Sequence, residues 1–219
     1  MPKRTSDADL PALRVALVTL DGHLAGAASR AFAALEKKAP GLECSLHCAG
    51  EWAAEPGLVD TCIEAIGNAH IVIVCMLFME EHIDPVMPAL KARRDDCDAM
   101  LCFMSAGDVM KLTRIGGFSM DGKQSGPLAL LKKLRGSKKN KQGSSGAKQM
   151  AMLRRLPRIL RFIPGTAQDV RAYFLGMQYW LAGSEENIRS LVSLLVTRYA
   201  ADNRVPTEHA QLDDNADGV

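Results

Sequence analysis

The first hundred residues alternate apolar runs with amphipathic stretches, and this alternation constrains the fold more than any other feature of the chain. Four apolar runs predict strands at 14–20, 42–48, 70–79 and 99–104, and the stretches between them have the apolar spacing of helices. Because the run at 70–79 is apolar at nearly every position, its strand should be covered on both faces. The pattern predicts a doubly wound α/β domain with a mainly parallel sheet, Rossmann or flavodoxin-like in type.

The pattern changes after Ser105. A short helix is predicted at 108–115, turns at 116–117 and 121–122, and a helix from Gly126, with no further strand. An α-helical extension then follows, in which Gly183 ends one helix and Ser184 caps the next, so the two should pack as an antiparallel pair. The predicted divisions are a mobile N-terminus (1–12), the α/β domain (13–122), a basic helix with a flexible linker (123–148), the helical extension (149–199) and a mobile acidic tail (200–219).

Residues 122–168, which we call the basic arm, contain twelve Lys or Arg and no Asp or Glu. The rest of the chain contains the other 15 of the 27 basic residues and all 25 acidic ones, so it has a net charge of −10. Such an arm is either a solvated surface or a binding site for a polyanion, an anionic membrane or an acidic protein. Nucleic acid is not expected, because 123–161 has no aromatic residue for base stacking. The candidate partner-binding residues are Lys132, Lys133, Arg135, Arg154, Arg158 and Arg161.

Polar residues follow each predicted strand, where ligands bind in open parallel sheets. Glu51, Trp52, Ser105 and Asp108 occupy such positions. The candidate ligand-binding residues are Asp21, His23, Glu80, Glu81 and His82. Carboxylates beside histidines could shuttle protons or hold a divalent metal, but carboxylates at helix starts also complement the helix dipole. Capping and solvation are the favoured interpretation, and no metal site is predicted.

The chain lacks the sequence signatures of several classes of protein. The chain has neither a GxxxxGK[ST] nor a GxGxxG sequence, which argues against a P-loop and a dinucleotide fingerprint, and no GxSxG nucleophile elbow. The six cysteines have neither zinc-site nor disulfide spacing and are predicted to be reduced core residues. The polar start of the chain and the lack of a transmembrane-length apolar run predict a cytoplasmic location.

Four segments of the chain have distinctive sequences: the strand-to-helix segment 71–82, the segment KLTRIGGFSM (111–120), the run LRRLPRILRFIP (153–164) and the segment 167–187. These segments resemble the N-terminal domain of the magnesium chelatase H subunit, in the form found in bacteria that make bacteriochlorophyll. The resemblance covers about 14–199. H subunits are several times longer, so the chain is expected to be a truncated form or a single domain.

The resemblance implies a role in magnesium chelatase, which inserts Mg²⁺ into protoporphyrin IX on the way to (bacterio)chlorophyll. In that family the porphyrin is held by the H subunit, and ATP is hydrolysed by the I and D subunits, which are AAA⁺ proteins. Protoporphyrin IX and Mg²⁺ are therefore expected as substrates of the complex, with no cofactor or catalytic residue assigned to this domain. It is expected to be cytoplasmic or peripheral at the photosynthetic membrane.

Two alternatives stay open beside this interpretation. The basic arm could dock the acidic surface of an ATPase subunit or of the next enzyme in the pathway. The domain could also be a free-standing porphyrin carrier. In that case the apolar helices at 168–199, with Tyr179 and Trp180, would cradle the macrocycle, and Arg residues would pair with its propionates. A core position is nevertheless favoured for Trp180.

Overall fold

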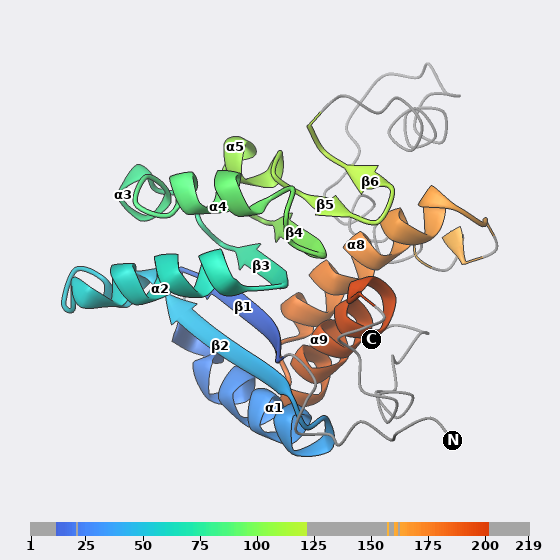
Figure 1. Cartoon of the computed structure of the whole chain (residues 1–219), viewed down its shortest axis with the longest axis horizontal. Helices are drawn as coiled ribbons and strands as arrows, with labels where there is room; N and C mark the ends of the chain where they lie inside the picture. Colours follow the sequence, from blue (N-terminus) through green and yellow to red (C-terminus); the bar gives the residue numbers. More distant parts are fainter. Residues whose placement is uncertain (1–11, 21, 122–156, 158–159, 162, 202–219) are drawn as a thin grey trace, which may run out of the picture.

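The computed structural model describes residues 12–20, 22–121, 157, 160–161 and 163–201. Most of the predicted mobile segments, 1–12 and 200–219, and most of the basic arm lie outside these residues. Figure 1 shows a twisted sheet between two layers of helices.

The strands are β1 (Leu13–Thr19), β2 (Leu42–Cys48), β3 (Ile71–Cys75), β4 (Ala99–Phe103), β5 (Arg114–Ile115) and β6 (Phe118–Ser119). The α-helices are α1 (Ala25–Lys38), α2 (Gly57–Asn68), α3 (Glu80–Ile83), α4 (Met87–Arg93), α5 (Gly107–Met110), α8 (Thr166–Ala182) and α9 (Glu185–Tyr199), and the short 3₁₀ turns are η2 (Gly22–Leu24) and η3 (Ala49–Glu51).

The strand order in the sheet is β2-β1-β3-β4-β5-β6. The first four strands are parallel, as predicted, and all residues of β3 and β4 are buried. Burial of both faces explains why β3 is apolar throughout rather than alternating. The mainly parallel α/β fold predicted from the sequence is therefore confirmed.

The two faces of the sheet carry separate cores. On one face, alternate residues of β1, β3 and β4, such as Val15, Ile73 and Leu101, pack with α1, α8 and α9. On the other face, residues such as Val72 and Met100 pack with α2 and α4. The predicted helical extension is present as α8 and α9, and these helices complete the first layer beside α1. The Ser184 side chain accepts a hydrogen bond from the backbone N–H of Asn187, which confirms the predicted cap.

Three predictions about the middle of the chain are wrong. The expectation of no strand after β4 fails because β5 and β6 form an antiparallel hairpin on the sheet edge. The predicted helix at 108–115 accordingly ends at Met110. The stretch between β3 and β4, whose apolar spacing predicts one helix at about 81–94, is divided into α3 and α4, with Pro85 between them. Proline has no N–H to donate to the helix ladder, whereas Pro88 is tolerated in the first turn of α4.

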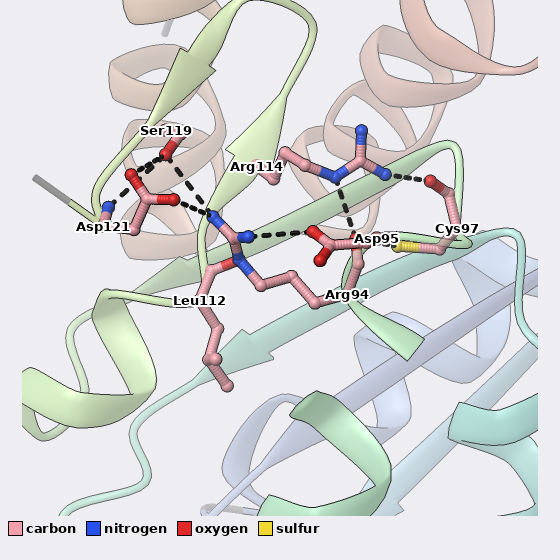
Figure 2. Close-up of polar contacts among 7 residues, drawn as sticks. All are labelled: Arg94, Asp95, Cys97, Leu112, Arg114, Ser119 and Asp121. Atoms are coloured by element: carbon pink, nitrogen blue, oxygen red, sulfur yellow. Dashed lines mark hydrogen bonds and ion pairs between the residues drawn. The ribbon is translucent and has the colours of Figure 1, made fainter. Parts of the chain in front are cut away.

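Two arginines attach the β5–β6 hairpin to the end of α4 (Figure 2). The Arg94 guanidinium donates from Nε to the backbone oxygen of Leu112 at 3.2 Å and from Nη2 to Asp121 Oδ2 at 2.9 Å. Arg114 donates from Nε to the backbone oxygen of Arg94 at 2.8 Å and from Nη2 to that of Cys97. Planar guanidinium groups suit this work because they present several donors in one fixed plane. The hairpin is therefore held by side chains as well as by its short ladder.

Candidate functional site

The carboxyl edge of the parallel strands is the first place to look for a ligand site. The chain leaves β1 towards β2 on one side and returns to β3 on the other, so the direction of winding reverses between β1 and β3. Open α/β sheets bind ligands in the crevice that forms at such a switch point. We call the edge of the sheet between the segment after β1, at 22–24, and the segment after β3, at 76–80, the β1–β3 crevice.

The structure describes four of the five candidate ligand-binding residues, with His23 after β1 and the other three in α3 after β3. His23 is exposed in η2, while Glu80 and Glu81 are exposed in the first turn of α3. Glu81 Oε1 lies 4.0 Å from His82 Nε2. Asp21 lies outside the described residues. Carboxylates in a first turn have the position that the helix dipole favours, although neither side chain caps α3 with a hydrogen bond.

His82 has a neighbour that sequence spacing did not reveal. Its ring packs edge-on against Trp52, with ring centroids 6.2 Å apart and an interplanar angle of 70°. Trp52 follows β2 and is 6% exposed. Within the part of the chain that the structure describes, His82 Nδ1 is buried and has no hydrogen-bond partner. The segments after β2 and β3 therefore meet through this aromatic pair.

Exposed apolar side chains stand on the β3 side of the crevice. Phe78 is 52% exposed and Met79 is 51% exposed. The backbone behind them is constrained, because Met76 and Met104 both have positive φ, at 65° and 48°, and the Met76 N–H donates to the Met104 oxygen at 3.0 Å. Left-handed conformations of non-glycine residues cost free energy and cluster at functional positions. The crevice thus presents an apolar contact on a fixed backbone.

A second hollow, of about 440 Å³, lies between the edge strand β2 and helix α2. His47 and Ser45 line it, with His47 Nε2 3.1 Å from Ser45 Oγ, and Arg14 pairs with Glu43 at its rim at 2.9 Å. Burial lowers the pKa of His47. None of these residues was predicted as a site residue. Polar residues alternate along β2, and this pattern indicates that one face of the strand is not packed against apolar side chains.

The described residues contain no group of three or more His, Cys, Asp or Glu side chains that could hold a metal ion. Among the same residues, none of the helices has both the length and the apolarity needed to cross a bilayer.

The tryptophan and tyrosine proposed as a porphyrin cradle are core residues. Tyr179 is 1% exposed and Trp180 is 5% exposed, and both pack in the core that α8 shares with the sheet. These two side chains are therefore not exposed to a ligand, and the core position favoured for Trp180 is confirmed. Of the six candidate residues in the basic arm, Arg161 is described and is exposed. Lys132, Lys133, Arg135, Arg154 and Arg158 lie outside the described residues.

All six cysteines are free thiols, and all but Cys44 are buried. Burial raises the pKa of Cys62 and that of Cys75 to about 12. Between pH 9 and 12 the unfolded chain releases thiol protons that the folded chain retains, so the free energy of unfolding should fall as the pH rises. We expect urea denaturation midpoints to be lower at pH 10 than at pH 8. A midpoint that stays constant over this range would contradict the assigned burial of the thiols.

Comparison with known proteins gives a consistent result. Residues 14–174 match the family model DUF3479, described as a domain of unknown function. The chain is 48% identical over 204 residues to the magnesium-chelatase H subunit of Cereibacter sphaeroides and 46% identical over 190 residues to that of Rhodobacter capsulatus. These alignments cover 93% and 87% of the chain but 17% and 16% of the relatives. The chloroplastic magnesium-chelatase protein ChlH of Oryza sativa subsp. japonica is 30% identical over 196 residues, covering 87% of the chain and 14% of that protein.

Proposed function

The chain belongs to the DUF3479 domain family, and from its similarity to magnesium-chelatase H subunits we propose that it works as a non-catalytic domain of such a subunit. In this proposal the domain contributes to ATP-dependent insertion of Mg²⁺ into protoporphyrin IX. Its part is to handle the porphyrin or to contact other subunits, while ATP is hydrolysed by the AAA⁺ proteins of the complex, the I and D subunits. The chelation site itself belongs to other parts of the complex.

One observation carries the proposal. The 48% identity with the Cereibacter sphaeroides protein extends over 93% of the chain, so it covers both the α/β layers and helices α8 and α9. Since the chain spans 17% of that relative's length, the activity of the whole relative comes to this chain only as a proposal.

We propose that the crevice between β1 and β3 is the working face of the domain. His23 follows β1, Glu80, Glu81 and His82 follow β3, and Phe78 and Met79 offer apolar surface beside them. Monomeric proteins expose isolated apolar side chains freely, but two adjacent ones at a switch point fit a surface that is covered in a complex. The basic arm, with its candidates from Lys132 to Arg161, is proposed as a second docking surface for an acidic subunit.

The test is a chimera of the Cereibacter sphaeroides H subunit in which this chain replaces the matching segment. We expect the chimera to support formation of magnesium protoporphyrin, followed by its fluorescence, when the ATPase subunits, ATP and Mg²⁺ are added. A deletion variant that lacks the segment should lose activity. Full activity of the deletion variant would refute the proposal.

A double variant of the chimera, Phe78→Ser with Met79→Ser, tests the working face. If a partner covers these side chains, losing one of them should weaken binding of that partner by about 1.5 kcal/mol or more. Below saturation with the partner, this corresponds to a roughly tenfold lower rate of magnesium protoporphyrin formation. Leu181→Ser is the matched control, because Leu181 is also 51% exposed but lies at the end of α8. Equal rates for the two variants would show that the crevice is not the contact. A rate that falls steeply with salt in all variants would favour docking by the basic arm.

A further inference from the structure

An apolar pocket of about 330 Å³ lies between α5, β6 and α8, beyond the carboxyl end of β4. It is separate from the β1–β3 crevice, because β4 lies on the other side of β3. Three aromatic residues, Phe118, Tyr173 and Phe174, form its wall, and Met110 and Met120 complete the apolar lining. Ligand pockets in proteins have this character, with mostly apolar walls and few polar groups.

The aromatic wall is held in a fixed arrangement. The rings of Phe118 and Tyr173 meet edge to face at 5.6 Å and 67°, and those of Tyr173 and Phe174 at 5.4 Å and 88°. Phe118 is 2% exposed and Tyr173 is 6% exposed, so packing from behind fixes their rotamers. Edge-to-face pairs are a favoured geometry for aromatic rings and need no rearrangement to receive another flat group.

Two residues that line this pocket carry groups that can donate hydrogen bonds. Burial raises the pKa of the Tyr173 hydroxyl to about 12, so it keeps its proton. Lys111 supplies the cation. Its Nζ lies 2.7 Å from Asp108 Oδ1, but both side chains are more than half exposed, so solvent weakens their ion pair. An ammonium group has three donors and can serve a second carboxylate.

We propose that this pocket binds a flat, apolar ligand that carries a carboxylate. The aromatic wall accepts the flat body, Lys111 pairs with the carboxylate, and the Tyr173 hydroxyl donates to an oxygen of the ligand. A volume of about 330 Å³ is near the lower limit for ligand pockets, which suits a small aromatic acid or the edge of a larger flat molecule. The inference rests on the proposed function only in the choice of protoporphyrin IX as one probe.

The experiment titrates the purified chain with two acids, protoporphyrin IX and 2-naphthoate, and with their methyl esters, and follows ligand fluorescence. We expect saturable binding of one acid or both, and weaker binding of the matching ester. Binding of 2-naphthoate alone would identify a small aromatic acid as the ligand, and binding of protoporphyrin IX would identify a tetrapyrrole edge. Absence of saturable binding to a folded chain would overturn the inference.

Three variants locate the site. Lys111→Gln should weaken binding of the acid about fivefold and leave the ester unchanged, because only the acid has a charge to pair. Asp108→Asn should strengthen binding of the acid, because it frees Lys111 from its competing partner. Tyr173→Phe keeps the ring and should weaken both ligands. The matched control is Lys38→Gln, which changes the net charge equally from the end of α1.

Some results would count against the pocket. If Lys38→Gln weakens the acid as much as Lys111→Gln does, the effect is general electrostatics and the inference fails. If the chimera is active but no variant changes binding, the pocket inference falls and the proposed function stands. If the variants behave as expected but the deletion variant is fully active, the pocket stands and the proposed function falls.

Discussion

Replacing Gly116 with alanine is expected to destabilise the folded chain by about 3 kcal/mol. Gly116 has a φ of +52°, in the left-handed region, and it is the first of the two glycines that turn β5 into β6. A Cβ at this position would lie 2.7 Å from both carboxylate oxygens of Asp169. The substitution therefore adds backbone strain and forces Asp169 to move.

Moving Asp169 breaks contacts that connect three elements. Its Oδ2 accepts a hydrogen bond from the Gly117 N–H at 2.9 Å, and its Oδ1 accepts one from the Tyr199 hydroxyl at 3.0 Å. Asp169 on α8 thus ties the β5–β6 hairpin to α9. Thermal unfolding followed by circular dichroism should show a melting temperature lower by roughly 10 °C.

Gly41→Ala is the matched control. Gly41 also has a positive φ, at +89°, but a Cβ there would meet nothing within 4 Å. We expect it to cost about 1 kcal/mol, from strain alone. In the double variant Gly116→Ala with Asp169→Ala, the clash is gone, so the loss should be smaller than the sum of the two single losses. Equal destabilisation by Gly116→Ala and Gly41→Ala would show that the Asp169 contact does not matter.

The sequence predicted the parallel half of the fold because its signals are local. β3 and β4 are apolar runs of five residues, and β1 is mostly apolar. Helices with clear apolar stripes separate the strands, and Gly183 and Ser184 mark a helix end and a helix start. Strands β5 and β6 were missed because two residues are too short to show a period of two. Pairing with β4 and with each other makes them strands. The neighbouring Thr113 hydroxyl adds two bonds to the backbone of Cys102 on β4: it donates to the oxygen at 2.8 Å and accepts from the N–H at 3.2 Å.

The candidate sites were predictable only in part, for a related reason. Topology rules place residues after each strand at one edge of the sheet, so His23, Glu80 and His82 could be named from the sequence. The contact between Trp52 and His82 depends on side-chain directions across 30 positions, which no spacing rule gives. The aromatic pocket is assembled from 107–120 and 173–174, two segments separated by the basic arm, and only the packing of α8 brings them together.

Gly176→Val should be at least as damaging as the change at Gly116, because it overfills the core between α8, α9 and the sheet. A Cβ on Gly176 would lie 2.9 Å from Leu101 Cδ2 and 3.1 Å from Leu191 Cδ1, and both leucines are fully buried. Alanine is normally favoured over glycine within a helix by about 1 kcal/mol, so the glycine is retained against helix propensity. It lets α8 approach β4 and α9 closely, and valine adds two methyl groups to the occupied space. We expect a loss of about 3 kcal/mol in the free energy of urea unfolding.

The control for this substitution is Gly67→Val, near the end of α2. Gly67 is also helical and exposed, and a Cβ there would meet nothing within 4 Å, so valine should change stability by less than about 0.5 kcal/mol. Leu191→Ala removes one of the two clashing methyl groups. Because that change empties the space that valine needs, Gly176→Val should cost less in the Leu191→Ala background than in the wild type. If Gly176→Val unfolds at the same urea concentration as Gly67→Val, α8 does not lie against β4 and α9 at this distance, and the layer of helices over that face of the sheet would have to be placed differently.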